Sequence, residues 1–246
     1  MEACPFMSHI NLSDTDVPGA ALSAALVAWD RMVALTANDM GDDQSAHHKN
    51  QAAVEVLQVL PPTLRELRMD SVSRAFFIAS GDNLAALPDL RVLCMPGGPA
   101  LRYAFLAHPQ LEPADGHLED DEAAKLIEIL EASPRLEHID LGSRHVTDAV
   151  LAALVASCPR VHTLSIGYTR VNDWGILVDH ANALPALRTL IVIRCEAFDE
   201  KALTALLATH PKVEMVNCSE TGVDARTRIK LMKQLRAKHG RRVVLV

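Results

Sequence analysis

Side chains of the kinds that bind metals occur in two short pairs, Asp115 with His117 and His138 with Asp140. Imidazole nitrogens and carboxylate oxygens are ligands of divalent metal ions, so four such groups brought together could hold one. They would meet only on neighbouring strands in register, and Pro113 removes a backbone donor from the first segment. We interpret both pairs as solvated polar residues and predict neither a metal site nor a cofactor.

The cysteines are odd in number, widely spaced and without a CxxC pair. This usage is typical of reduced thiols in a cytosolic or nuclear protein, and we expect Cys158 and Cys195 to pack inside the fold rather than to act as nucleophiles. No GxSxG or HExxH motif occurs, and Gly97–Gly98 between two prolines indicates a turn and not a phosphate loop. The sequence therefore predicts no catalytic residue and no enzyme. The cysteines are Cys4, Cys94, Cys158, Cys195 and Cys218.

Charge is divided unevenly along the chain. The net charge is -7 over 246 residues, yet the segment from Arg226 onward holds eight basic residues and no acidic one, so residues 1–225 carry -15. An acidic body disfavours nucleic acid and anionic membranes as partners. For the basic segment we favour a solvated cap with cationic charge near a helix C-terminus, with an acidic protein surface as the second interpretation.

Neither a signal peptide nor a membrane span is visible. The first residues hold no basic stretch ahead of an apolar run, and the longest nearly apolar stretch, Gly19 to Trp29, is too short to cross a bilayer. We therefore expect a cytoplasmic or nuclear protein.

One signature recurs: a proline followed by aliphatic residues at the second, fifth and seventh positions. From Leu90 onward the first aliphatic residue returns at intervals of 21, 25, 25, 26 and 26 residues. Repetition at this period is typical of solenoid proteins. The copies read PTLRELRM, PDLRVLCM, PRLEHIDL, PRVHTLSI, PALRTLIV and PKVEMVNC, with weaker ones at Pro5 and Pro109.

Each copy predicts a strand, a turn and a helix. Aliphatic residues at alternate positions bury one face of a short strand, and the preceding proline stops the helix before it. Acidic residues then open aliphatic helices, at Thr147–Asp148, at Asp199 and at Asp120–Asp121. Helical crossovers make the strands parallel. We predict an α/β solenoid of about eight to ten units of roughly 25 residues, with a curved parallel β-sheet on the concave side and helices on the convex side.

This pattern resembles leucine-rich repeats of the ribonuclease-inhibitor-like and cysteine-containing subclasses. Residues 157–173, SCPRVHTLSIGYTRVND, match the second subclass in the Cys-Pro before the strand and the Val-x-Asp after it. Cys195 falls where that subclass often has cysteine, and Cys4–Pro5 repeats the pair. Neighbouring units hold Arg144 and Thr169 at the position of Cys195, and the asparagine ladder of commoner repeats is missing.

The repeats predict a single leucine-rich-repeat domain over residues 1–246. Its parts are irregular repeats over 1–60 with a polar insertion at 40–50, clear repeats over 61–222, and a basic cap with a final strand over 223–246. The short interval at Leu111 predicts a broken or bent strand. No capping segment precedes the strand expected at Met7–Leu12, so either a partner or a second copy covers its edge, or the chain belongs to a longer product.

Side chains between the buried aliphatic residues of each strand are expected on the concave face. Ile191, Ile193 and Met215 are apolar there, and an exposed apolar patch typically marks a partner surface. The alternative is that the C-terminal segment folds over them. The other candidates for partner binding are Glu66, Arg68, Asp70, His138, Asp140, Thr163, Ser165, Thr189 and Asn217.

A long concave face with few motifs favours a non-catalytic scaffold or adaptor that binds another protein. The resemblance implies narrower versions of that role. These are the substrate receptor of a ubiquitin ligase (its F-box absent from this chain), a subunit of a larger complex, and a bacterial effector that mimics host repeats. The GTPase-activating protein for Ran shares the ribonuclease-inhibitor-like repeat, but no residues here match its active surface, which disfavours that alternative.

Overall fold

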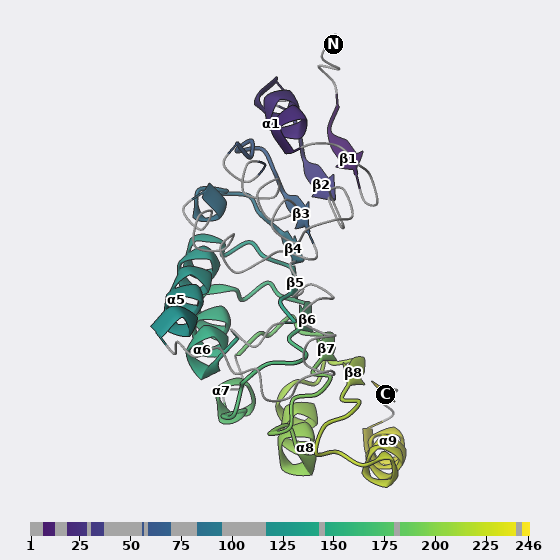
Figure 1. The fold of residues 1–246 in the computed structure, drawn as a ribbon. Helices are drawn as coiled ribbons and strands as arrows, with labels where there is room; N and C mark the ends of the chain where they lie inside the picture. The colour runs from purple at the N-terminus through teal and green to yellow at the C-terminus, as the bar shows by residue number, and fades with distance from the viewer. Residues whose placement is uncertain are drawn as a thin grey trace, which may run out of the picture. The chain divides into compact units, whose positions relative to one another are not determined.

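The computed structural model describes residues 7–12, 19–28, 31–36, 56, 59–69, 83–94, 117–142, 146–179, 183–239 and 243–246. The chain divides into two compact units, Met1–Arg135 and Leu136–Val246, each with its own strands and helices (Figure 1). The predicted insertion at 40–50, the predicted break at 111–113 and the candidate Asp70 lie outside the described residues.

The first unit pairs four short strands in chain order, all parallel. Leu35, Leu67 and Leu93, at the centres of β2, β3 and β4, are fully buried, as the period-2 pattern predicts. The expected N-terminal strand is confirmed as β1. The described elements are β1 (His9–Asn11), α1 (Gly19–Ala28), β2 (Ala34–Thr36), β3 (Glu66–Arg68), β4 (Val92–Cys94) and α5 (His117–Ala132).

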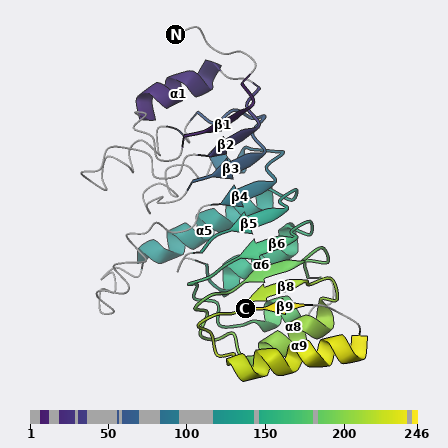
Figure 2. The same cartoon turned by 90° about the vertical axis from the view of Figure 1, so that its right-hand side faces the viewer.

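The second unit repeats strand and helix with greater regularity. Its five strands pair in chain order and are all parallel. The strands lie on one side and the helices on the other, as Figures 1 and 2 show. The elements are β5 (His138–Asp140), α6 (Asp148–Ser157), β6 (Thr163–Ser165), α7 (Gly175–Val178), β7 (Thr189–Ile191), α8 (Glu200–Thr209), β8 (Met215–Asn217), α9 (Ala225–His239) and β9 (Val244–Leu245).

An aliphatic core fills the space between these strands and helices. The aliphatic residues of the signature form columns through successive strands; Ile139, Leu164, Leu190 and Val216, at the strand centres, are all fully buried. The helices meet them with residues spaced three and four apart, such as Leu203, Leu206 and Leu207 of α8. This confirms the predicted parallel α/β repeat, in which each unit buries its apolar side against its neighbours.

Helix starts follow the prediction in part. The Asp199 carboxylate accepts a hydrogen bond from the Ala202 N–H at 2.8 Å and caps α8 as expected. Asp224 does the same for α9 through the Thr227 N–H at 2.8 Å, and that hydrogen bond holds the pKa of Asp224 below its usual value.

Two helix starts differ from the prediction. Thr147 precedes α6 without a side-chain capping bond, and the neighbouring Asp148 carboxylate accepts a hydrogen bond from another segment. Asp120 and Asp121 lie within α5, which already includes His117, rather than ahead of it. No helix in the described part of the chain has the length and apolar character needed to cross a membrane.

Candidate protein-binding face

The strands of the second unit alternate strictly between buried and half-exposed side chains. In β5, β6, β7 and β8 the central residue is buried and both flanking residues are half-exposed. Successive strand residues point to opposite faces of a sheet, so the flanking residues share the face away from the helices. We call this surface of β5–β9 the sheet face.

Backbone register brings the predicted residues of the sheet face into two rows. Each row crosses neighbouring strands that lie about 4.8 Å apart. The residues at the starts of the strands pair in the order His138, Thr163, Thr189, Met215 and Val244. The residues at the strand ends pair in the order Asp140, Ser165, Ile191 and Asn217.

The apolar part of the sheet face is larger than the sequence analysis predicted. Ile191, Ile193 and Met215 are half-exposed, so the C-terminal segment does not bury them. Instead that segment adds β9 beside β8, and Val244 lies next to Met215 in register with 55% of its surface exposed. The alternation of VVLV, with Val243 and Leu245 buried, is the sequence signal that identifies Val244 as a face residue.

A polar ridge follows the strand ends on one border of the sheet face. Tyr168, Arg194 and Glu220 hold equivalent positions 26 residues apart, and each has a positive φ, at 63°, 58° and 56°. The Arg194 guanidinium lies 5.5 Å from the Tyr168 ring centre, and its Nε donates to Glu220 Oε2 at 2.5 Å. The hydrogen bond to Glu220 raises the pKa of Arg194 above its usual value. Sequence reasoning missed this ridge, although the regular spacing was visible.

The opposite border carries a second ion pair between neighbouring strands. Arg188 Nη1 donates to Glu214 Oε1 at 2.9 Å, and both side chains are exposed. Within the sheet face, Asn217 uses its amide oxygen to accept from the Ser219 N–H and hydroxyl at 3.2 and 2.8 Å. Surface ion pairs of this kind contribute little to stability. Their effect here is to neutralise both borders of the apolar patch.

Two further candidates lie in the first unit. Glu66 and Arg68 flank the buried centre of β3, opposite Val92 and Cys94 of β4. The Arg68 Nη1 donates to Cys94 Sγ at 3.3 Å, which holds the guanidinium along the strand pair.

Three described cysteines of the second unit are buried thiols. Cys158, Cys195 and Cys218 are all fully buried. Burial raises the pKa of Cys158 to about 12, and it also raises the pKa values of Cys195 and Cys218. A thiol that stays protonated is a poor nucleophile. Cys195 instead donates to the Ile166 carbonyl at 3.3 Å, which confirms the predicted packing role.

The described residues give no geometric support to a metal site formed by the four side chains considered above. Among the described residues, no three His, Cys, Asp or Glu side chains gather in a way that could hold a metal ion. Asp115 lies outside those residues, so the distance from it to His138 and Asp140 is not defined.

Comparisons with known proteins yield structural likeness at low sequence identity. No protein-family model and no curated protein sequence matches the chain. An internalin from Listeria monocytogenes is similar with a TM-score of 0.45 and 14% identity, over 93% of this chain and 60% of the internalin. The chain thus spans less than two thirds of that protein.

Two other solved structures are similar to the same degree. A protein from Bacteroides fragilis has a TM-score of 0.45 and 11% identity, over 100% of this chain and 67% of its own. A chain from the yeast complex of Rad7 and Elc1 has a TM-score of 0.45 and 10% identity, over 92% and 67%. On the evidence of its own strand register, buried aliphatic columns and helical crossovers, this protein has a leucine-rich-repeat fold.

Proposed function

We propose that this protein is a non-catalytic interaction scaffold whose sheet face binds another protein. The observation that carries the proposal is the run of partly exposed apolar side chains on three consecutive strands, Ile191 on β7, Met215 on β8 and Val244 on β9. Exposed apolar side chains gathered on one face typically mark a contact site.

The surroundings of the patch indicate what kind of contact it makes. Both bordering arginines, Arg188 and Arg194, are already paired with glutamates, so the borders offer no strong net charge to a partner. Binding would then depend on apolar burial at the centre with hydrogen bonds from Thr189 and Asn217 around it. This is the usual arrangement of a dry centre and a polar rim in protein interfaces.

Affinity capture followed by a direct titration tests the proposal. The wild-type protein and the double variant Ile191→Asp/Ile193→Asp are used to capture proteins from an extract of the source organism. The protein captured by wild type is then purified and titrated against both by calorimetry. We expect the double variant to weaken binding about 100-fold or more, because two carboxylates at the centre of a desolvated contact cost several kcal/mol.

Val27→Asp is the control, since Val27 is an exposed aliphatic residue of α1 in the first unit, 72% exposed, and belongs to no strand of the sheet face. It should bind the captured protein as wild type does. Equal affinity of wild type and the double variant would contradict the proposal. The identity of the captured protein also distinguishes the narrower roles. Capture of ubiquitin-ligase components would support the role of substrate receptor, and capture of a host protein would support the role of effector. Capture of a stoichiometric assembly would support the role of complex subunit.

A further inference from the structure

Among the described residues, β9 pairs with β8 on one edge and with no strand on the other. Val244 and Val246 donate their N–H groups to the Glu214 and Val216 carbonyls at 2.8 and 3.0 Å, so their backbone groups face β8. Backbone groups of successive strand residues point to opposite edges, so the N–H and C=O of Leu245 face outward. No described residue pairs with them. Such an edge is a template for another strand.

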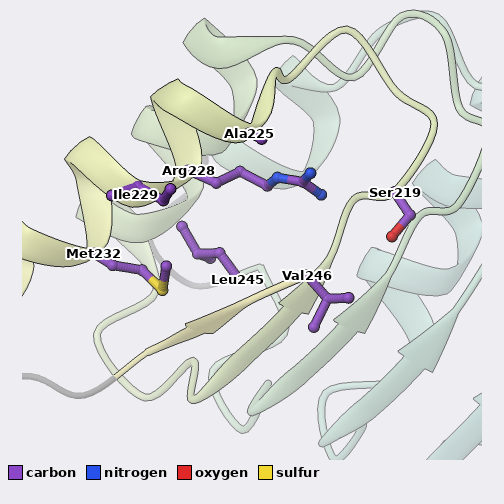
Figure 3. Close-up of a pocket in the computed structure, with 7 residues that line it drawn as sticks. All are labelled: Ser219, Ala225, Arg228, Ile229, Met232, Leu245 and Val246. Carbon is purple, nitrogen blue, oxygen red and sulfur yellow. The ribbon is translucent and has the colours of Figure 1, made fainter.

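An open apolar pocket lies beside this edge, between β9 and α9. Its volume is about 270 Å³. Figure 3 shows Ile229 and Met232 of α9 near Leu245, and the Arg228 side chain extending from α9 toward Ser219. Met232 shares a helix face with Ile229 and Arg228 because it follows them by three and four positions. Ile229 is 50% exposed, so the pocket has an apolar wall open to a ligand. We call the strand edge and the pocket together the edge groove.

Basic side chains are frequent on α9. Arg228 lines the pocket and also interacts with Cys218, while the exposed Arg226, Lys230, Lys233 and Arg236 lie elsewhere along the same helix. No described acidic side chain forms an ion pair with any of these five residues. The segment from Arg226 onward contains eight basic residues and no acidic one. The charge of α9 therefore favours an acidic ligand.

We propose that the edge groove binds an acidic protein segment in extended conformation, which pairs with β9 as an added strand. One apolar side chain of that segment would fill the pocket beside Ile229 and Met232, and carboxylates flanking it would face Arg228 and its neighbours. This mode of recognition uses main-chain hydrogen bonds for affinity and a side-chain pocket for specificity. A polyanion such as nucleic acid fits less well, because none of the lining residues is an aromatic on which bases could stack.

The inference concerns a surface other than the sheet face and is tested with a defined probe. The fluorescein-labelled peptide Glu-Val-Leu-Val-Asp-Glu is titrated with the full chain, and anisotropy is measured. We expect saturable binding that weakens about tenfold or more when NaCl rises from about 50 to about 500 mM, because surface charge attraction is screened. A peptide with lysine in place of each acid, and one with a methylated leucine N–H, should each bind at least about tenfold more weakly.

Variants of the groove and matched controls locate the site. Ile229→Asp and Arg228→Gln should each reduce peptide affinity by about tenfold. Ile191→Asp, on the sheet face, and Arg160→Gln, an exposed arginine outside the groove, should leave it unchanged, so failure of this inference and failure of the proposed function are distinguishable.

The inference is overturned if the acidic peptide shows no saturable binding, if Ile229→Asp binds it as wild type does, or if an oligothymidine binds more tightly at the same salt. It is also overturned if sedimentation shows wild-type dimers that Ile229→Asp dissociates, because a second copy would then occupy the groove.

Discussion

His210 comes directly before a proline, at the position that Cys158 and Leu184 hold in neighbouring repeats. The imidazole is 4% exposed, and Nε2 lies 2.7 Å from the Ala183 carbonyl oxygen while Nδ1 lies 2.8 Å from Thr209 Oγ1. Burial lowers the pKa of His210 below its usual value despite the favourable carbonyl contact. The repeat pattern predicts a buried residue at this position, but it gives no sign of the hydrogen bonds that let a histidine occupy it.

This lowered pKa makes the stability of the protein depend on pH. Unfolding returns His210 to its ordinary pKa near 6.5, so below that pH the unfolded chain takes up a proton that the folded chain refuses. We expect the free energy of unfolding to be maximal above about pH 6.5 and to fall with acidification, with a contribution from this residue of at most ~1.4 kcal/mol per pH unit. Urea denaturation at a series of pH values measures the slope.

The variant His210→Leu isolates that contribution, since leucine holds the same place at Leu184. It loses the hydrogen bond to Ala183, which should lower stability by about 1–3 kcal/mol at every pH. Its stability should nevertheless vary less with pH than that of wild type between pH 6.5 and 5. A slope equal to that of wild type would mean that other groups cause the acid sensitivity.

At the scale of elements, the sequence predicted the strands well because a single local rule places them. Aliphatic residues two positions apart, behind a proline, can bury only one face of a short strand, and β3 to β8 lie where that rule puts them. The helices depend on more distant contacts, and they were less predictable. The short α7, of four residues, follows Trp174, which packs edge-to-face on Phe198 of the next repeat with ring centres 4.8 Å apart.

Asp148 illustrates a role that local pattern cannot reveal. It stands at the first residue of α6, where the sequence predicts a cap, yet its carboxylate accepts from the N–H groups of Asn172 and Asp173 at 2.8 and 3.0 Å. These residues lie 24 and 25 positions later. The carboxylate thus ties one helix start to the segment that leads into the next helix.

Loss of that tie should destabilise the second unit. We expect Asp148→Ala to lower the free energy of unfolding by about 1–2 kcal/mol, because two backbone donors lose a charged acceptor while staying close to water. Asp148→Asn keeps one acceptor oxygen and should lose about half as much. Urea denaturation followed by tryptophan fluorescence measures both, since Trp174 is buried near this contact. Full stability of Asp148→Ala would show that water replaces the carboxylate without cost.

At the scale of the whole molecule, the second unit is a stack in which each strand depends on its neighbours. Sequence period alone predicted that stack, and it also predicted which residues reach the sheet face, because both follow from alternation along strands. It could not predict that Val244 extends the apolar patch or that β9 has β8 as its one neighbour among the described strands, since these depend on which strands end up adjacent.

In such a stack, the loss of free energy of unfolding on replacing a buried leucine by alanine depends on whether its strand lies inside the sheet or at its edge. Leu190, at the centre of β7, is fully buried between β6 and β8. Leu245 is buried to a similar degree on β9, which pairs with β8 on one side. We expect Leu190→Ala to lower the free energy of unfolding by about 3–4 kcal/mol and Leu245→Ala by about 1–2 kcal/mol, because the cavity at the edge opens to water and can collapse.

Hydrogen exchange then distinguishes a stack of coupled repeats from one cooperative block. If coupling passes only between neighbours, Leu245→Ala should speed exchange at β9 and β8 and leave β5 protected, whereas Leu190→Ala should expose amides on both of its sides. Val244→Ala serves as the reference, since the same strand loses only an exposed side chain. Equal acceleration at β5 and β8 in the Leu245 variant would mean that the second unit unfolds all at once. In that case a ligand bound in the edge groove would raise the free energy of unfolding of the whole second unit. Amide exchange would then slow at β5 to the same extent as at β9.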